Sequence, residues 1–592
     1  MTPATEPHLE YARRKGVALT EIAQWDQRSI HIGNARLAVF IFAAFMVYLF
    51  YDDRISGYLL FLPVFAFVGL MAWHARVEGA RKRASRLATY YERGLARIAD
   101  RWHDFGSKGE RFADAKHPFA RDLDLFGNAS LFQLLNGART RMGEETLANW
   151  LTVLSKPEVI CARQIAVSEL AGNLQLREDL AVLGDELHSG VHPARLRSWG
   201  AEPVVLRGGW QQLIAVLLAI VNVCGIGYWF TTGHIWPMGG ALLVTSIFTF
   251  VLRAHIMNIL QAAGGVSGDL QLLASVLERL EREPFQSPYL VKLRLALETG
   301  GEPPSRAVAR LAKLSQWIDS LANPVAQLLN WILLIAVHLA FGVEAWRHSY
   351  GRMIARWIDA VGEIEAVLSL AAYHYEHPLD PFAEIVEGPL CWEGTGLGHP
   401  LLHSATMVRN SLNFSVDQPF TMISGSNMSG KSTFLRTVGI NTVMALAGVP
   451  VRAQKLRLSV FAIGACIQTI DSLAEGRSRF YTEILRLKAI VELTRNGPPV
   501  LFLLDELLAG TNSHDRRIGA AGILCGLLDN GAIGLVTTHD LTLTQWDDPR
   551  IRNLHFEDHL EHGELKFDYR MRDGVVAKSN ALELMRTIGL DV

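Results

Sequence analysis

The nonapeptide Gly425-Ser-Asn-Met-Ser-Gly-Lys-Ser-Thr433 decides the fold of the C-terminal part of the chain. It has the pattern G-x-x-x-x-G-K-[ST], in which glycines let backbone N–H groups curl around phosphate oxygens. A strand-like run, 419–424, precedes it and a helix-like run, 433–448, follows it, so a helix N-terminus adds positive potential at the loop. The nonapeptide therefore predicts a nucleotide site; a glycine-rich turn formed by chance is the alternative.

Each residue of this loop is a candidate nucleotide ligand. The set is Gly425, Ser426, Asn427, Met428, Ser429, Gly430, Lys431, Ser432 and Thr433. We expect the ammonium group of Lys431 to reach the β and γ phosphates, and the hydroxyl of Ser432 to ligate Mg²⁺.

A second motif, Pro499-Val-Leu-Phe-Leu-Leu-Asp-Glu506, ends an apolar run with two carboxylates. A continuous apolar run predicts a buried parallel strand, and its C-terminal end is where ligands bind in α/β sheets. Adjacent strand residues point to opposite faces, so the two acids need different roles. Asp505 suits the Mg²⁺ site, and Glu506 suits the base that orients water on the γ-phosphate. A strand end with two solvated acids is the alternative.

A third motif, 531–540, is another strand with a polar end that carries His539. A histidine there could sense the γ-phosphate, whereas the alternative is a histidine that only caps a loop. The three motifs in this order fit an ABC-type ATPase. They predict an α/β P-loop domain with a mostly parallel sheet, and ATP and Mg²⁺ as its cofactors.

Four apolar stretches lie upstream, in two pairs that are each joined by a short polar turn. They are Leu37–Tyr51, Tyr58–Trp73, Leu213–Phe230 and Ile235–Leu252. Each is about 15–18 residues long, close to the length that spans a bilayer, and apolar on every face. We therefore predict two transmembrane helical hairpins; two hairpins buried in a soluble core are the alternative.

Basic residues flank both hairpins, among them Arg13, Arg81 and Arg253. The positive-inside rule places these flanks in the cytoplasm, which predicts a multi-pass protein of the cytoplasmic (inner) membrane with its ATPase and core domains in the cytoplasm. A fifth apolar run, Leu328–Val343, is interpreted as a buried core helix, because a fifth span would put the nucleotide site on the other side of the membrane.

The amino-acid composition excludes several classes of protein. The chain of 592 residues is 49% hydrophobic and 20% charged, which excludes disordered and collagen-like proteins. Its net charge of −2 gives no global attraction to nucleic acid. The five cysteines form no Cys-x-x-Cys pair, which excludes a disulfide scaffold and a cysteine zinc site. We expect no cleaved signal peptide.

The sequence divides into seven expected segments. They are an N-terminal amphipathic helix (1–36), hairpin 1 (37–75), a helical linker (76–118), the first part of a helical core (119–207), hairpin 2 (208–254), the second part of that core (255–378) and the ATPase domain (379–592).

The segments around the acidic strand distinguish between kinds of ABC-type ATPase. The LSGGQ of a transporter is missing. Instead, Asp471-SLAEGRSRFYTEI-Leu485 precedes the strand and Leu507-LAGTNSH-Asp515 follows it. With Asn427–Met428 of the phosphate loop, these segments resemble the MutS family of DNA mismatch-repair ATPases. Upstream, 126–152 resembles the start of that family's all-α core domain.

The resemblance implies a homodimer with composite ATP sites. It places Ser478 against the partner's γ-phosphate, and it makes Lys431, Asn427, Glu506 and His539 the catalytic set. It also implies a dimer-interface loop: Gly510, Thr511, Asn512, Ser513 and Asp515. Met407 stands where the family offers an aromatic side chain to adenine, so we expect weaker packing on the base.

The N-terminal mismatch-recognition domain of the family, with its Phe-x-Glu wedge, has no counterpart in this sequence. Basic residues in 291–310 and 346–356 could contact duplex DNA, although acidic residues are interleaved and a solvated helix face is the alternative. Our hypothesis is a membrane-anchored MutS-like ATPase, DNA-related and with a still unidentified protein partner. The alternatives are a membrane machine without a DNA role, a transport ATPase, a scaffold that binds ATP without turnover, and a mismatch sensor held at the membrane.

Overall fold

The computed structural model describes the chain in ten stretches. They are 6–183, 193–206, 209–298, 301–468, 479–495, 497–508, 511–540, 542–546, 548–561 and 564–576. Two compact units emerge. The first contains Met1–Gly137, Ala148–Val182 and Ser369–Val592, and the second contains Ala138–Leu147 and Leu183–Leu368. The chain passes between the units four times, and two of these crossings lie inside helices, α4 (Arg141–Thr152) and α15 (Ile354–Glu376).

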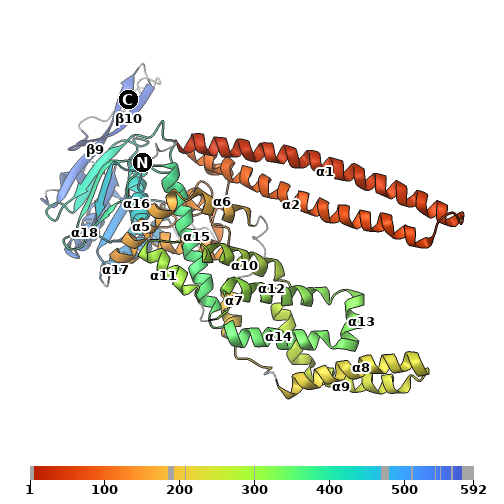
Figure 1. Ribbon diagram of the computed structural model, residues 1–592. Coiled ribbons are helices and arrows are strands. Elements are labelled where there is room, and N and C mark those ends of the chain that lie inside the picture. The colour runs from red at the N-terminus through yellow and green to blue at the C-terminus, as the bar shows by residue number, and fades with distance from the viewer. Residues whose placement is uncertain are drawn as a thin grey trace. The chain divides into compact units, whose positions relative to one another are not determined.

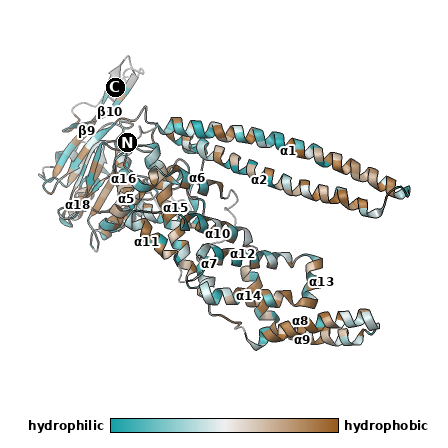
Figure 2. Ribbon diagram, viewed as in Figure 1, coloured by the Kyte–Doolittle hydropathy of each residue, from teal (hydrophilic) through white to brown (hydrophobic). Residues whose placement is uncertain are grey.

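The first unit begins with a long antiparallel helical hairpin (Figure 1). Its helices, α1 (Pro7–Tyr51) and α2 (Phe61–Ile98), pack along each other. At 1.5 Å per residue, the 45 residues of α1 extend about 68 Å, roughly twice the hydrocarbon thickness of a bilayer. Figure 2 shows hydrophilic residues near the base of α1 and hydrophobic ones in its distal half. The expected boundaries at 36 and 75 therefore fall inside continuous helices.

The distal half of this hairpin exposes large apolar side chains, such as Phe40, Tyr48 and Phe65. Only 11% and 6% of the most apolar windows of the two helices are buried. The first unit therefore does not enclose the hairpin as part of a soluble core.

Two sheets and their helices form the α/β part of the first unit. The shorter helices and strands of this unit are α3 (Leu131–Leu135), α5 (Pro157–Ala171), α6 (Leu174–Val182), β1 (Glu384–Ile385), β2 (Trp392–Leu397), β3 (Asn410–Phe414), β4 (Phe420–Ser424), α16 (Lys431–Ala447), β5 (Lys455–Leu458), β6 (Ala462–Cys466), α17 (Arg479–Leu493), β7 (Val500–Asp505), α18 (Ser513–Asp529), β8 (Ile533–Thr538), β9 (Ile551–Glu561) and β10 (Glu564–Asp573).

The larger sheet has the order β10-β9-β4-β8-β7-β6, and every pairing except β10 with β9 is parallel. Strands β4 and β8 are buried along their whole length, as the apolar runs predict. The smaller sheet, β1-β5-β2-β3, mixes one parallel and two antiparallel pairings. The expected helix-rich part followed by an α/β domain is confirmed, and the smaller mixed sheet is an addition.

The second unit is helical in the residues that the structure describes. Besides its parts of α4 and α15 it contains α7 (Pro193–Ala201), α8 (Trp210–Thr232), α9 (Trp236–Ala263), α10 (Ser267–Glu281), α11 (Pro288–Ala296), α12 (Pro304–Ser320), α13 (Pro324–Leu333) and α14 (Ile335–Tyr350). Helices α8 and α9 form the second hairpin. Gly233 ends α8 in a left-handed conformation at φ +75°, which favours glycine.

The run Leu328–Val343 is not the single buried helix that we expected. The left-handed residue Leu334, at φ +51°, breaks it into α13 and α14, whose axes differ by 80°. Helix α14 is largely buried, whereas α13 contributes no buried residue. By length and composition, four helices of the described chain could cross a membrane, or five if α13 and α14 count as one span.

Candidate nucleotide-binding site

The phosphate loop joins β4 to α16, as the sequence predicts. Gly425 has φ +150°, and a Cβ atom there would lie 2.9 Å from the carbonyl oxygen of Phe556. Gly430, at φ +103°, precedes the first residue of α16. These positions need glycine, so the loop conformation follows from the spacing of its two glycines.

Lys431 is buried and turns back into the loop. Its Nζ atom donates hydrogen bonds to the carbonyl oxygens of Gly425 and Ser426, both at 2.8 Å. Burial lowers the pKa of this ammonium group, and the carboxylates of Glu506 and Asp505 oppose that shift. A phosphate within reach would give the buried cation a stronger partner than neutral carbonyl groups.

The loop also holds two buried hydroxyl groups. In the part of the chain that the structure describes, the Oγ atoms of Ser426 and Ser429 have no hydrogen-bond partner. Buried polar atoms in folded proteins are nearly always satisfied, so these two atoms suit phosphate oxygens or bound water.

The two other motifs meet beside the loop. Strands β7 and β8 are parallel neighbours, with Asp505 opposite Thr537, whose hydroxyl donates a hydrogen bond to the Asp505 carboxylate. Glu506 adopts a left-handed conformation at φ +48°, and its N–H donates to the Thr537 carbonyl oxygen at 3.1 Å. The Nδ1 atom of His539 lies 3.3 Å from a carboxylate oxygen of Glu506. The candidate base and the candidate γ-phosphate sensor are therefore in contact.

A cleft of about 720 Å³ opens at this edge of the sheet. Of the residues proposed from the sequence, those that line it are Met407, Asn427, Met428, Gly430, Lys431, Ser432, Thr433, Asp505 and Glu506. Gly425, Ser426 and Ser429 belong to the loop behind it, and His539 is adjacent through Glu506. A cleft of this size has room for a nucleotide.

The cleft is also lined by residues that the sequence analysis did not propose, among them the polar or aromatic residues His399, Asn410 and Tyr569. The amide Nδ2 atom of Asn410 donates to the Tyr569 carbonyl oxygen at 2.9 Å, which holds an aromatic ring at the cleft. Burial, assisted by the charge of Arg436, lowers the pKa of His399 to about 4, so its ring is neutral at pH 7. The three residues come from segments far apart in the chain, after β2, at the start of β3 and within β10, so no local motif places them together.

The cleft offers few ligands for a metal ion. Among the described residues, no group of three or more His, Cys, Asp or Glu side chains could hold one. Ser432 and Asp505, the pair expected at Mg²⁺, do line the same cleft. Mg²⁺ usually binds through one or two protein groups and completes its shell with water and phosphate, so this pair fits the ion in a nucleotide complex.

The residues expected at a dimer interface are only partly described. Ser478 and Gly510 lie outside the described residues, and of Ser513 only the backbone is described. Asn512 caps the N-terminus of α18 by accepting a hydrogen bond from the Asp515 N–H at 2.8 Å, and Thr511 precedes this cap. The loop therefore leads directly into a stable helix start.

Asp100, just after the end of α2, was also missed. Its carboxylate accepts hydrogen bonds from the Ser404 N–H at 2.8 Å and the Ser404 hydroxyl at 2.6 Å. Ser404 lies between Leu402 and Met407, which both line the cleft. The first hairpin thus ends on the loop that forms one wall of the cleft.

Comparison with known proteins finds similarity to MutS proteins. A family model described as MutS domain V matches residues 421–591. The chain is 32% identical over 241 residues to a DNA mismatch repair protein MutS of Thermotoga petrophila, covering 39% of this chain and 29% of that protein. It is 31% identical over 240 residues to an Endonuclease MutS2 of Pelotomaculum thermopropionicum, covering 39% and 29%.

A MutS of Thermus aquaticus is 35% identical over 195 residues, which cover 32% of this chain and 23% of that protein. The chain thus spans less than a third of the length of the curated relatives that it matches. The family-model match covers the residues that carry the three motifs, so residues 421–591 are similar to MutS domain V.

Proposed function

We propose that this chain is a membrane-anchored, MutS-like ATPase whose nucleotide site is coupled to the hairpin α1/α2. The observation that carries the proposal is the pair of hydrogen bonds between Asp100, at the end of that hairpin, and Ser404, in the wall of the cleft. A change in the cleft that moves this loop would act directly on the base of the hairpin.

The residues of the cleft have complementary roles in ATP hydrolysis. Lys431 binds the β and γ phosphates, and Glu506 orients the attacking water, with His539 holding its carboxylate in place. Ser432 and Asp505 would hold Mg²⁺, which would neutralise phosphate charge. By resemblance to the family, a second copy completes the site, so the working form is a homodimer joined through its ATPase heads.

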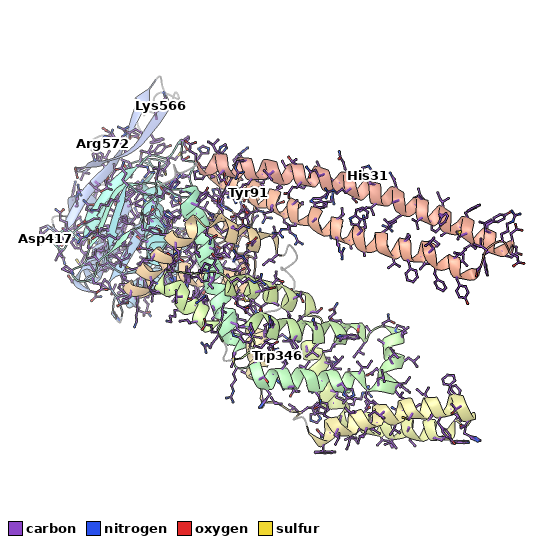
Figure 3. The ribbon with its side chains drawn as sticks, viewed as in Figure 1. His31, Tyr91, Trp346, Asp417, Lys566 and Arg572 are labelled. Carbon is purple, nitrogen blue, oxygen red and sulfur yellow. The ribbon has the colours of Figure 1, made fainter. Side chains whose placement is uncertain are left out.

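The base of the hairpin is fastened by a buried ion pair. Arg97 of α2 donates to both carboxylate oxygens of Glu376, at 2.6 and 2.5 Å, and the Glu376 side chain is fully buried. The Tyr11 hydroxyl of α1 donates to the same carboxylate at 3.3 Å and accepts from Arg177 at 3.2 Å. Figure 3 places the neighbouring Tyr91 at this base. Both helices of the hairpin are thus anchored at one carboxylate.

A second series of hydrogen bonds runs from the same region toward the phosphate loop. Tyr373, three residues before Glu376, donates to Asp380 at 3.2 Å, and Arg452 donates to Asp380 at 3.0 Å. The N–H of Arg452 donates to Asn441 of α16 at 2.8 Å. Helix α16 begins with the phosphate loop, so this series offers a physical route from the nucleotide to the hairpin.

Membrane anchoring rests on the uncovered apolar surfaces of both hairpins. Large hydrophobic side chains that remain exposed over a whole helical hairpin are expected to contact lipid. With basic flanks on the same side, we place the protein in the cytoplasmic (inner) membrane with its ATPase part in the cytoplasm.

Duplex DNA is a second candidate partner, favoured by the names of the MutS relatives. The structure reduces the charge available for it in the basic stretch 291–310. Arg310 pairs with Glu302 at 2.7 Å, and Arg294 lies 4.0 Å from Glu298. Paired cations attract phosphate less strongly, so we place coupling to the membrane before DNA binding.

The test is ATP turnover by the protein in nanodiscs, with and without duplex DNA, beside Glu506→Gln. We expect turnover by the wild-type protein and at least about 100-fold less in the variant, because the group that orients water is lost, while ATP binding persists. A turnover rate that changes with DNA, and less so at high salt, would establish a DNA-responsive enzyme. Equal turnover in wild type and variant would refute the proposed mechanism.

A further inference from the structure

The break at Leu334 leaves helix termini whose backbone groups need partners. The carbonyl oxygen of Asn330 accepts the N–H of Leu334 at 2.9 Å, and the side chain of Asn330 accepts the N–H of Ala336 at 2.7 Å. The carbonyl oxygen of Ile332 accepts a hydrogen bond from the side-chain amide of Asn222, in α8, at 3.0 Å. The junction thus uses two asparagine side chains in place of water.

Asn222 is fully buried between the two helices of the second hairpin. Besides binding Ile332, its amide donates to the hydroxyl of Thr245, in α9, at 3.1 Å. In a hairpin that is otherwise apolar, a buried amide is costly unless it is satisfied. All of its interactions here join α8 and α9 to the end of α13.

The outward face of α13 is apolar. Val325, Leu328 and Trp331 follow one another at three-residue spacing and are each about two-thirds exposed. No Asp, Glu, Lys or Arg occurs between Asp319 and Glu344. Helix α13 also packs against α8, whose own exposed surface is apolar, so the two surfaces are continuous.

We propose that α13 is a re-entrant membrane helix that lies among the acyl chains of the bilayer beside α8 and α9. This rests on the proposed membrane insertion of the second hairpin. A break with unsatisfied backbone groups is not tolerated in lipid, and the groups named above at this break are satisfied by protein.

The position of the junction along the hairpin gives its depth. Asn222 lies ten residues before the end of α8, and Thr245 lies nine residues after the start of α9. At 1.5 Å per residue, both place the junction about 15 Å from the tip of the hairpin, half the thickness of the hydrocarbon core. Helix α14 then leads to the buried pair of Glu344 and Arg347, so the chain returns to the side it came from.

The test measures collisions of a spin label with oxygen, which concentrates in lipid, and with a water-soluble nickel chelate. Labels are attached to single cysteines in the full-length protein in nanodiscs, after replacement of Cys161, Cys224 and Cys525. The test position is Leu328 of α13, 66% exposed. The references are Leu243 of α9, 63% exposed, and Leu295 of α11, 49% exposed.

We expect the oxygen-to-nickel ratio at Leu328 to match that at Leu243 and to lie far above that at Leu295. A ratio at Leu328 like that at Leu295, with Leu243 in lipid, would refute the re-entrant helix and leave the membrane hairpin intact. Protection of Leu328 from both reagents would refute it in favour of a protein contact, such as a second copy. Nickel access at Leu243 would refute the hairpin and the re-entrant helix together.

Substitution of the buried amide gives an independent test. Asn222→Leu leaves the Ile332 carbonyl unpaired, so we expect the oxygen-to-nickel ratio at Leu328 to fall toward that at Leu295. Ser246→Leu is the matched control, because among the described residues the exposed Ser246 hydroxyl donates its hydrogen bond within its own helix, to the Leu242 carbonyl oxygen. An unchanged ratio in Asn222→Leu would contradict the proposed role of this amide.

Discussion

The two hairpins differ in what fastens them. Hairpin α1/α2 is long, and charged side chains at its base, Arg97 and Asp100, tie it to the rest of the first unit, which contains the cleft. Hairpin α8/α9 is shorter, and a neutral amide in its middle, Asn222, ties it to a broken helix of the second unit. A charged fastening belongs outside the membrane, whereas a satisfied neutral amide is tolerated within it.

This difference suggests different tasks. The first hairpin extends about 68 Å, and a bilayer needs about half of that length. Under the proposed membrane insertion, the other half forms a stalk on the side of the cleft, and the second hairpin, with its polar junction at mid-depth, is a fixed anchor. The nucleotide site should therefore respond to changes in the first hairpin and not to changes in the second.

The largest effect is expected from Arg97→Met. The change leaves the buried carboxylate of Glu376 without its cation, which typically costs about 3–5 kcal/mol. We expect a clear fall in the thermal midpoint of the first unit, measured in nanodiscs, and partial recovery in the double variant with Glu376→Gln. The exposed Arg101→Met is the control. An unchanged midpoint in Arg97→Met would mean that the ion pair does not fasten the hairpin.

The stability of the first unit should depend on pH through His399, which lies in the wall of the cleft. Burial lowers the pKa of His399 to about 4 from its ordinary value of 6.5, so the unfolded chain binds more protons between these values. The contribution of His399 to the free energy of unfolding is therefore complete above pH 6.5. It is lost as the pH falls toward 4, and the loss is roughly 3 kcal/mol.

The measurement is the midpoint of chemical unfolding of the first unit between pH 7 and pH 4. His399→Gln should flatten the pH dependence, because glutamine does not titrate. An equally steep dependence in wild type and variant would exclude His399 as its source.

A smaller effect is expected from Asp100→Ala. The change removes two hydrogen bonds to Ser404, so the wall of the cleft loses its support from the hairpin. We expect the Kd for ATP to rise about tenfold, equivalent to about 1.4 kcal/mol. Asp104→Ala, an exposed acid nearby, is the matched control. Equal ATP affinity in Asp100→Ala and wild type would contradict the proposed coupling between the hairpin and the cleft.

The smallest effect on ATP is expected from Asn222→Leu. The amide lies in the second hairpin, and among the described residues its side-chain hydrogen bonds go to Thr245 and Ile332. We expect the Kd for ATP and the turnover rate to stay within about twofold of wild type, below about 0.4 kcal/mol. A tenfold change in either quantity would show that the second hairpin also controls the nucleotide site.

The phosphate loop, the acidic strand and the strand of His539 could be predicted from sequence because each motif is local. Two acids at the end of a buried strand favour a ligand site, and parallel strands bring such ends together at one edge of the sheet. The hairpins could also be predicted, as apolar runs. The contacts between these elements could not be predicted, because Asp100 and Ser404 are 304 residues apart and no pattern links them.

The break at Leu334 also escaped prediction. The run Leu328–Val343 contains no proline or other strong helix breaker at its centre, so propensity alone favours one continuous helix. What permits the break is tertiary: the amides of Asn222 and Asn330 satisfy the backbone around the junction. Such compensation is visible only when α8 and α13 are placed together.

The distance between the first hairpin and the α/β part of the first unit is the most direct measure of the coupling. His31 on the first hairpin and Asp417 in the α/β part are both exposed, lie in the same unit and are labelled in Figure 3. Spin labels are attached at these two positions in the Glu506→Gln variant in nanodiscs. Pulsed electron paramagnetic resonance then measures the distance between the labels. We predict that ATP shifts the distance distribution and that Asp100→Ala abolishes the shift. One distribution that is the same with and without ATP would contradict the coupling of the nucleotide site to the membrane hairpin.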